Sequence, residues 1–124
     1  MNTVLWIVAA VLAVAFLGAG AMKLTKTREQ LQPQMPWVED ASDGMVKGIG
    51  AAEALGALGL ILLGLTGIAP VLTPIAATGL VVTMIGALIT HIRRGEGLAA
   101  SIPAIVLGLL SAFVAWGRFG SYPL

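Results

Sequence analysis

Long stretches without a charged side chain constrain this sequence more than any other feature. Three of them are 20 residues long, from Thr3 to Met22, from Val71 to Thr90 and from Leu98 to Gly117. A helix of about 20 apolar residues spans the hydrocarbon core of a bilayer, which is about 30 Å thick. Charged residues make up only 10% of the chain, whereas a soluble domain has about 25%. We therefore predict an integral membrane protein rather than a very apolar soluble helical bundle.

A further membrane span is predicted around Glu53, a single carboxylate in the stretch GIGAAEALGALGLILLGL from Gly48 to Leu65. The uncharged part that follows it, Ala54 to Gly67, has 14 residues and is too short to cross a bilayer. The helix must therefore begin near Val46, which places Glu53 about one to two turns inside the span.

The predicted fold is an all-α, integral membrane, up-down four-helix bundle that forms one domain. The spans cover approximately residues 3–23, 46–66, 71–91 and 98–117, and residues 24–45 form a polar loop. Gly67, Pro70 and Pro74 indicate a tight turn between the second and third spans. In the last span, small residues recur at Ala100, Ala104, Gly108 and Ala112. Such a stripe packs against a neighbouring helix, either within the chain or in a homo-oligomer.

The first apolar run has an alternative interpretation as a secretory signal peptide, because Ala19-Gly20-Ala21 resembles a cleavage site. A signal peptide has basic residues before its apolar run. Here no basic residue precedes the run, and Lys23 and Lys26 follow it directly. We therefore expect a retained helix.

The polar loop leaves two interpretations open, a solvated connection between spans and a loop that covers a substrate. Its prolines, Pro33 and Pro36, interrupt helical structure. Trp37 is a candidate anchor at the level of the lipid headgroups. Candidate N-caps for the next helix are Asp40, Ser42 and Asp43.

The basic residues predict the orientation of the chain in the membrane. Six of them fall at one end of the predicted bundle, whereas Arg118 is alone at the other end. The six are Lys23, Lys26, Arg28, Lys47, Arg93 and Arg94. By the positive-inside rule, this end is cytoplasmic and both termini face outward.

Glu53 is the main candidate site residue, because a carboxylate within a span costs about 2.5–3.5 kcal/mol on insertion scales. Its helix face carries small residues, so we expect the side chain to point into the bundle. The topology brings Lys23, His91 and Arg93 to the same end of the membrane. In one interpretation, Lys23 or Arg93 neutralises Glu53 and the pair fixes the helices. In the other, Glu53 and His91 exchange protons or bind a polar headgroup in a small pocket.

Several kinds of site are excluded or not indicated by the composition. The chain has no cysteine and one histidine, which argues against thiol chemistry, Fe–S clusters and histidine-rich metal sites. No phosphate-binding loop, nucleophile elbow or metalloprotease motif is present. A net charge of +1 without a basic cluster gives no sign of nucleic-acid binding.

The sequence resembles the DoxX-like family of small bacterial four-helix membrane proteins. The resemblance rests on three segments that occur in the expected order and spacing and cover nearly the whole chain. They are GAGAMKL from Gly18 to Leu24, GIGAAEALGALG from Gly48 to Gly59, and MIGA at Met84–Ala87 followed by THIRRGE at Thr90–Glu96.

The resemblance implies a four-helix bundle in the bacterial cytoplasmic membrane, with Lys23, Glu53, His91 and Arg93 as recurring polar positions. It also implies an association with thiosulfate–quinone oxidoreduction and with complexes that protect against oxidative stress. Since the chain lacks cysteine, any redox role would need a bound quinone or a separate redox partner protein.

The leading hypothesis is a membrane protein that binds a quinone-like or lipid ligand beside Glu53, as part of a redox-linked complex. In it, Glu53 and His91 are the candidate catalytic residues, and Lys23 and Arg93 complete the cofactor-binding set. One alternative is a non-catalytic assembly subunit whose polar cluster only fixes helix packing. Another is a small transporter, which would require a homo-oligomer because four helices make a thin wall for a pore.

Overall fold

A computed structural model describes residues 1–33, 35–67 and 71–120, and these residues form helices and connections without strands. Four helices are long: α1 (Asn2–Thr25), α3 (Asp43–Thr66), α4 (Leu72–Arg93) and α5 (Leu98–Phe119). Two short elements, α2 (Arg28–Leu31) and the 3₁₀ helix η1 (Pro36–Asp40), lie between α1 and α3. Each long helix contains a segment long and apolar enough to cross a membrane. The predicted fold class, an all-α membrane bundle, is confirmed.

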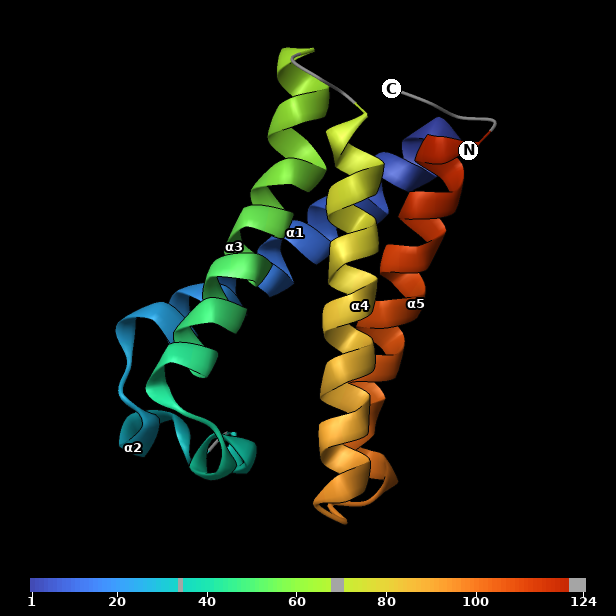
Figure 1. The fold of residues 1–124 in the computed structure, drawn as a ribbon. Coiled ribbons are helices and arrows are strands. Elements are labelled where there is room, and N and C mark those ends of the chain that lie inside the picture. Colours follow the sequence, from blue (N-terminus) through green and yellow to red (C-terminus); the bar gives the residue numbers. More distant parts are fainter. Residues whose placement is uncertain (34, 68–70, 121–124) are drawn as a thin grey trace.

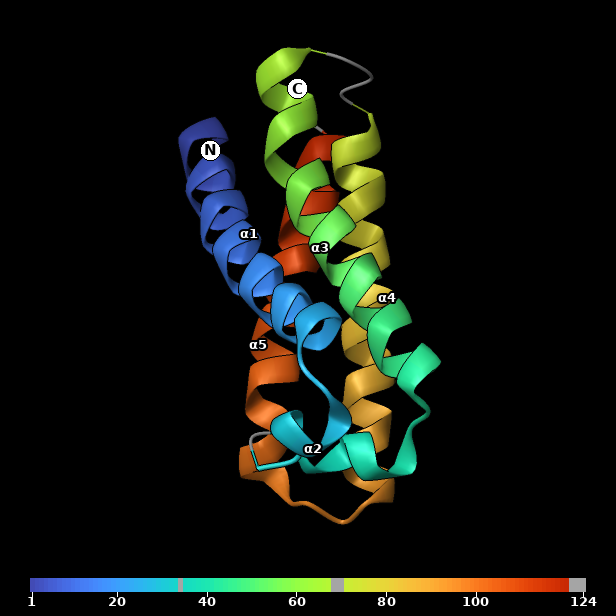
Figure 2. The same ribbon diagram turned by 90° about the vertical axis from the view of Figure 1, so that its left-hand side faces the viewer.

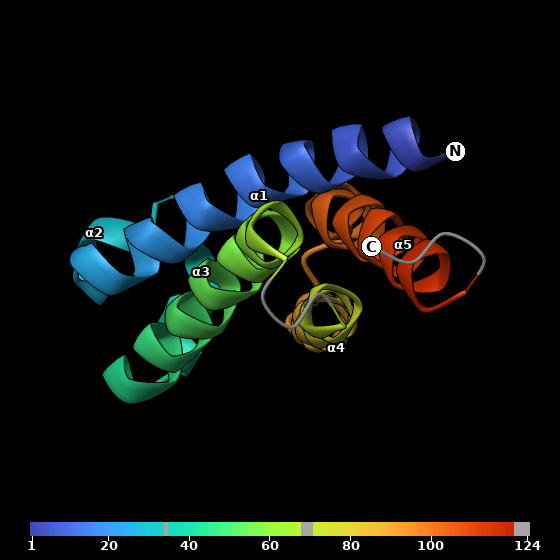
Figure 3. The same ribbon diagram turned by 90° about the horizontal axis from the view of Figure 1, so that it is seen from above.

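The long helices alternate in direction, and each contacts its neighbours in space. α1 packs on α3, α3 on α4, α4 on α5, and α5 on α1 (Figures 1 and 3). The start of α1 and the end of α5 lie at one end of the bundle (Figure 1). α2, η1 and the turn between α4 and α5 lie at the other end (Figure 2). The second end therefore gathers the end of α1, the start of α3 and the end of α4.

Apolar side chains cover both the inside and the outside of the bundle. The core consists of small and medium apolar side chains around Phe16, which is fully buried. Large apolar side chains such as Val14, Leu55 and Leu109 point outward and are exposed. Water would not tolerate such a continuous apolar exterior, whereas lipid does. The chain is therefore a multi-pass membrane protein.

A buried hydroxyl group and small residues fit neighbouring helices together in the apolar interior. The Thr73 hydroxyl of α4 donates a 2.9 Å hydrogen bond to the Gly59 carbonyl of α3. Within α4, the hydroxyls of Thr78, Thr83 and Thr90 donate to backbone carbonyls four residues earlier. In the small-residue stripe, Ala104 is buried, and a Cβ added at Gly108 would lie 3.2 Å from the Met84 Cβ. This part of the stripe packs within the chain, against α4.

The turns follow the predicted sequence signals where the structure describes them. Pro74 lies in the first turn of α4, where its missing N–H breaks no intrahelical bond, and Pro70 lies outside the described residues. Gly67 (φ 70°) directly follows α3. Ser42 is the N-cap of α3, because its hydroxyl accepts a hydrogen bond from the Met45 N–H at 3.1 Å.

The polar connection between α1 and α3 is folded and has a small core of its own. We call α2 and η1 together the cap. The buried side chains of this core are Leu31, Val38, Ala41 and Val46, and Met22, Met35 and Trp37 pack against them. Because Met22 belongs to α1 and Val46 to α3, the cap is attached to the ends of both helices.

Candidate functional site

The Lys23 and Glu53 side chains form an ion pair inside the bundle. The Lys23 Nζ donates a hydrogen bond to the Glu53 Oε1 over 2.6 Å. The side chains are only 8% and 3% exposed, respectively. Lys23 comes from the last turn of α1, and Glu53 from the third turn of α3. Two charges buried in an apolar protein are tolerated only when they are paired in this way.

Glycines allow α1 and α3 to approach closely beside this pair. A Cβ added at Gly20 would lie 2.6 Å from the Gly50 carbonyl oxygen, and one added at Gly50 would lie 2.7 Å from the Lys23 Cβ. Any side chain at these positions would push the helices apart. The two glycines therefore set the separation at which the Lys23 ammonium reaches the Glu53 carboxylate.

The cap contributes an aromatic side chain to the surroundings of the pair. The Trp37 ring of η1 has its centroid 5.9 Å from the Lys23 Nζ, a distance at which the ring face attracts a cation. Lys47, one residue after the cap core residue Val46, donates to the Leu24 carbonyl at 3.1 Å. The cap, α1 and α3 thus meet around Lys23.

A cavity of about 190 Å³ opens next to Lys23. Its lining combines the end of α1, the start of α2 and the start of α3, and contains Lys23, Thr25, Lys26, Thr27, Glu29, Asp43, Val46 and Lys47. Glu53 does not line it, so Lys23 stands between the cavity and the buried carboxylate. A molecule in the cavity would therefore contact Lys23 and not Glu53.

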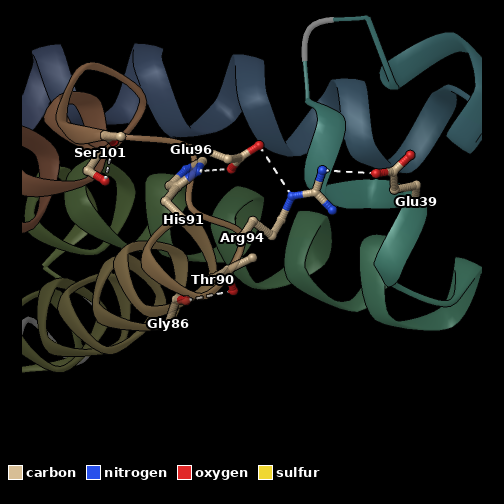
Figure 4. Close-up of polar contacts among 8 residues, drawn as sticks. Glu39, Gly86, Thr90, His91, Arg94, Glu96 and Ser101 are labelled. Carbon is tan, nitrogen blue, oxygen red and sulfur yellow. Dashed lines mark hydrogen bonds and ion pairs between the residues drawn. The ribbon is translucent and has the colours of Figure 1, made fainter.

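A second set of polar contacts joins the turn between α4 and α5 to the cap (Figure 4). The His91 Nδ1 lies 2.6 Å from the Glu96 Oε1, and the Arg94 Nε lies 3.2 Å from the Glu96 Oε2. Arg94 also donates from Nη2 to the Glu39 Oε1 of η1 at 3.0 Å. We call these four residues the latch, because they connect elements far apart in the sequence.

The pKa of the Glu96 carboxyl is lowered from its ordinary value, above all by the hydrogen bond with His91. Burial acts in the opposite direction, and the hydrogen bond and charge of Arg94 reinforce the lowering. An ionised Glu96 contacts His91 and forms an ion pair with Arg94, so the carboxylate is the form that holds the latch together.

The opposite end of the bundle contains a buried cation, Arg118. Its guanidinium donates to the Asn2 side chain at 2.5 Å and lies 5.5 Å from the centroid of the Trp6 ring. These contacts connect α5 to the first turns of α1. Arg118 therefore joins the two terminal helices and lies far along α1 from Lys23.

The structure divides the four predicted site residues between different surroundings. Lys23 and Glu53 contact each other, as one interpretation of the sequence expected. His91 instead bonds to Glu96, and Arg93 is exposed at the end of α4. In the described residues, no group of three or more His, Cys, Asp or Glu side chains is arranged to hold a metal ion.

Sequence reasoning missed several residues around the site. It used Arg94 only to predict the orientation of the chain, named Glu96 only as the end of a family-like segment, and treated Trp37 as a lipid anchor. Trp37 is followed by acidic residues and flanked by apolar ones at Met35 and Val38, a pattern that could have indicated a folded cap. The partner of Arg94, Glu39, is 55 residues away in the chain, and no local signal indicates that contact.

Comparison with known proteins identifies one family. The model of the DoxX-like family matches residues 7–114, which is most of the chain. No curated protein and no solved structure matches the sequence. The matched range contains Lys23, Glu53 and the whole cap.

Proposed function

The chain belongs to the DoxX-like family, and we propose that it binds the polar head of a lipophilic ligand beside the Lys23–Glu53 pair. One observation carries this proposal. The Lys23 side chain is buried, is held 2.6 Å from Glu53, and at the same time lines a cavity. A buried cation that serves only helix packing has no need of an adjoining space.

The chemistry of Lys23 suits a ligand with oxygen acceptors. A lysine ammonium has three N–H donors, and one is directed to Glu53. The others are available to a quinone carbonyl or to an ester or phosphate oxygen of a lipid. Glu53 keeps the ammonium oriented and balances its charge, which lowers the cost of holding a cation at this depth.

A quinone ligand would connect this site to redox chemistry. Conversion of a quinone to a quinol consumes two electrons and two protons, and Lys23 would donate a hydrogen bond to the oxygen that gains charge. Because the chain has no cysteine, the electrons would come from a soluble redox partner protein in a membrane complex. His91 bonds to Glu96, and we assign it no step at the pair.

The proposed location is the bacterial cytoplasmic membrane, with both termini outside. Six basic residues lie at the end of the bundle that carries the cap, and Arg118 is at the other end. The positive-inside rule then places the cap, the cavity and the latch on the cytoplasmic side. A soluble partner in the cytoplasm could reach them there.

Mass spectrometry of co-purifying molecules tests the proposed function. Wild type, Lys23→Met and Glu53→Gln would be purified in mild detergent, with Arg93→Gln as a control that keeps the pair intact. We expect wild type and the control to retain one lipophilic molecule, and each pair variant to retain about tenfold less, the effect of losing one charged hydrogen bond. Equal retention by folded pair variants would overturn the proposal.

A structural role in assembly is the second candidate, and the close approach at Gly20 and Gly50 favours it. In this case the pair would only fix the register of α1 against α3. The pair variants would then lose stability without losing any retained ligand. A charge-swapped protein, with Glu at 23 and Lys at 53, would regain part of the stability.

A further inference from the structure

The four long helices form two pairs that the chain joins at one end of the bundle. α1 and α3 are connected through the cap, and α4 and α5 through the turn that carries Glu96. The chain crosses from the first pair to the second once, between α3 and α4. This crossing lies at the end opposite the cap, which we call the far end (Figure 1). At the cap end, the pairs are therefore held together by side-chain contacts.

The two pairs pack closely in the half of the bundle toward the far end. A Cβ added at Gly117 of α5 would lie 2.7 Å from the side chain of Leu5 in α1. A Cβ added at Gly56 of α3 would lie 2.8 Å from the side chain of Leu80 in α4. The buried Thr73 hydroxyl also bonds α4 to α3 in this half. Such close-packed contacts fix the pairs relative to each other there.

Toward the cap end, α1 and α3 diverge from α4 and α5 (Figures 1 and 3). Each helix continues toward the cap beyond the apolar core of the bundle, whose buried residues nearest the cap are Phe16, Ala57, Met84 and Ala104. The cap has a separate core, made of residues from α1, α3 and the connection between them. The cap is thus packed as a part of the first pair.

The latch joins this first pair to the second at the cap end. Arg94 donates to the Glu39 carboxylate at 3.0 Å, and Gln32 donates to the other oxygen of that carboxylate at 2.9 Å. The Glu39 side chain is 49% exposed. An exposed ion pair typically changes an equilibrium by about fivefold or less, whereas each core is held by several buried apolar side chains. The latch is therefore the contact that separates most easily.

From these observations, we infer that the protein is a clamp that opens at the cap end. α1, α3 and the cap move as one body against α4 and α5. The close-packed contacts toward the far end act as the hinge, and the latch holds the closed form. Hinged movement of packed bodies is a common conformational change around binding sites.

Opening of the clamp would uncover the face of α3 on which Glu53 lies. Glu53 precedes the core residue Ala57 by four residues, so the two side chains share one face of the helix. In the closed form, the cavity beside Lys23 does not reach Glu53. In the open form, a molecule between the pairs would contact the carboxylate as well. This consequence rests on the proposed function, whereas the movement itself does not.

Distances between spin labels test the movement, and the chain suits them because it contains no cysteine. Met45→Cys with Leu98→Cys places labels at exposed positions of α3 and α5 at the cap end. Double electron–electron resonance in lipid nanodiscs would then measure their separation. We expect wild type to show mainly the closed distance, and Glu39→Gln to raise the share of longer distances about fivefold. Arg93→Gln removes an exposed arginine outside the latch and should match wild type.

Two further label pairs locate the movement, again at exposed positions. Leu24→Cys with Met45→Cys lies within the first helix pair, and Val4→Cys with Leu72→Cys compares the two helix pairs at the far end. Neither distance should change when the latch is broken. An unchanged closed distance at the cap end in both Glu39→Gln and Arg94→Gln would overturn the clamp. Longer distances at the far end or within the first pair would overturn it as well.

Alkylation of a buried thiol tests the same movement without labels. Ala57 is 1% exposed and belongs to the core between the helix pairs, so Ala57→Cys should react with N-ethylmaleimide only in the open form. We expect the rate to rise about fivefold when Glu39→Gln is added, and to stay the same when Arg93→Gln is added. Equal rates with and without the latch would overturn the clamp.

The outcomes distinguish this inference from the proposed function. Longer distances in the latch variants, with no lipophilic molecule retained by wild type, would support the clamp and overturn the proposed function. Fixed distances, with a molecule retained through Lys23 and Glu53, would overturn the clamp and support the proposed function.

Discussion

Replacement of Lys23 by methionine should be the most damaging single change to the charged pair. It leaves the Glu53 carboxylate, which is 3% exposed and does not line the cavity, without its cation. Removal of one partner of a buried pair costs about 3–5 kcal/mol. Since Lys23 is the cation that contacts this carboxylate in the described residues, we expect about 4 kcal/mol.

Replacement of Glu53 by methionine should cost less, although it breaks the same 2.6 Å bond. The orphaned Lys23 ammonium adjoins the cavity, lies 5.9 Å from the Trp37 ring and belongs to the last turn of α1. Water, the aromatic face and the helix dipole all stabilise a cation there. We expect a loss of about 2 kcal/mol, the value of one charged hydrogen bond.

The double variant tests whether the two costs share one cause. With methionine at both positions no buried charge remains, and apolar replacement of a buried ion pair is often neutral or stabilising. We expect the double variant to lie within about 1 kcal/mol of wild type, whereas independent effects would sum to about 6 kcal/mol.

The measurement is equilibrium unfolding of the purified proteins in mixed micelles with a rising fraction of a denaturing detergent. Tryptophan fluorescence reports the transition, because Trp37 lies beside Lys23. Lys47→Met, an exposed lysine at the same end with one bond to the Leu24 carbonyl, is the control and should cost less than about 1 kcal/mol. Additive losses in the double variant, or equal losses in the two single variants, would refute this reasoning.

Two further predictions follow from the contacts around the site. Gly50→Ala should lower the stability by about 1–3 kcal/mol through overpacking, because its Cβ would lie 2.7 Å from the Lys23 Cβ, whereas Gly48→Ala has open space and should be neutral in the same unfolding assay. Glu96, whose pKa is lowered in the folded protein, stabilises the fold above its unfolded pKa, and this contribution disappears as the pH falls through the folded pKa. As the pH decreases, the melting temperature of wild type should therefore fall more than that of Glu96→Gln. Parallel curves of melting temperature against pH for the two proteins would show that the hydrogen bond with His91 does not contribute to stability.

The sequence predicted the fold class and the family because both depend on features that can be read along the chain. These features are the lengths of the uncharged runs and the order of the family-like segments. The lengths of the uncharged runs indicate membrane-spanning helices, and the short uncharged remainder after Glu53 places that residue inside a span. The DoxX-like resemblance, confirmed over residues 7–114, rests on segments whose order is visible in one dimension.

The surroundings of Glu53 could be predicted only as a choice between partners. Lys23 and Arg93 both belong to the end of the bundle that Glu53 approaches. The sequence does not tell how each helix is rotated about its own axis, so it does not tell which of the two side chains faces Glu53. The close approach of Gly20 to Gly50 decides the choice, because it turns the face of α1 that carries Lys23 toward α3.

The sequence by itself determined that the chain crosses the membrane several times and that a carboxylate is placed within a span. Both follow from hydropathy along the chain, which needs no knowledge of neighbours. Only the tertiary structure decided that the polar connection folds into a cap, that Arg94 joins this cap to a distant turn, and that Lys23 separates Glu53 from a cavity. These contacts join residues 30 and 55 positions apart, and their formation depends on helix rotation and close packing in three dimensions.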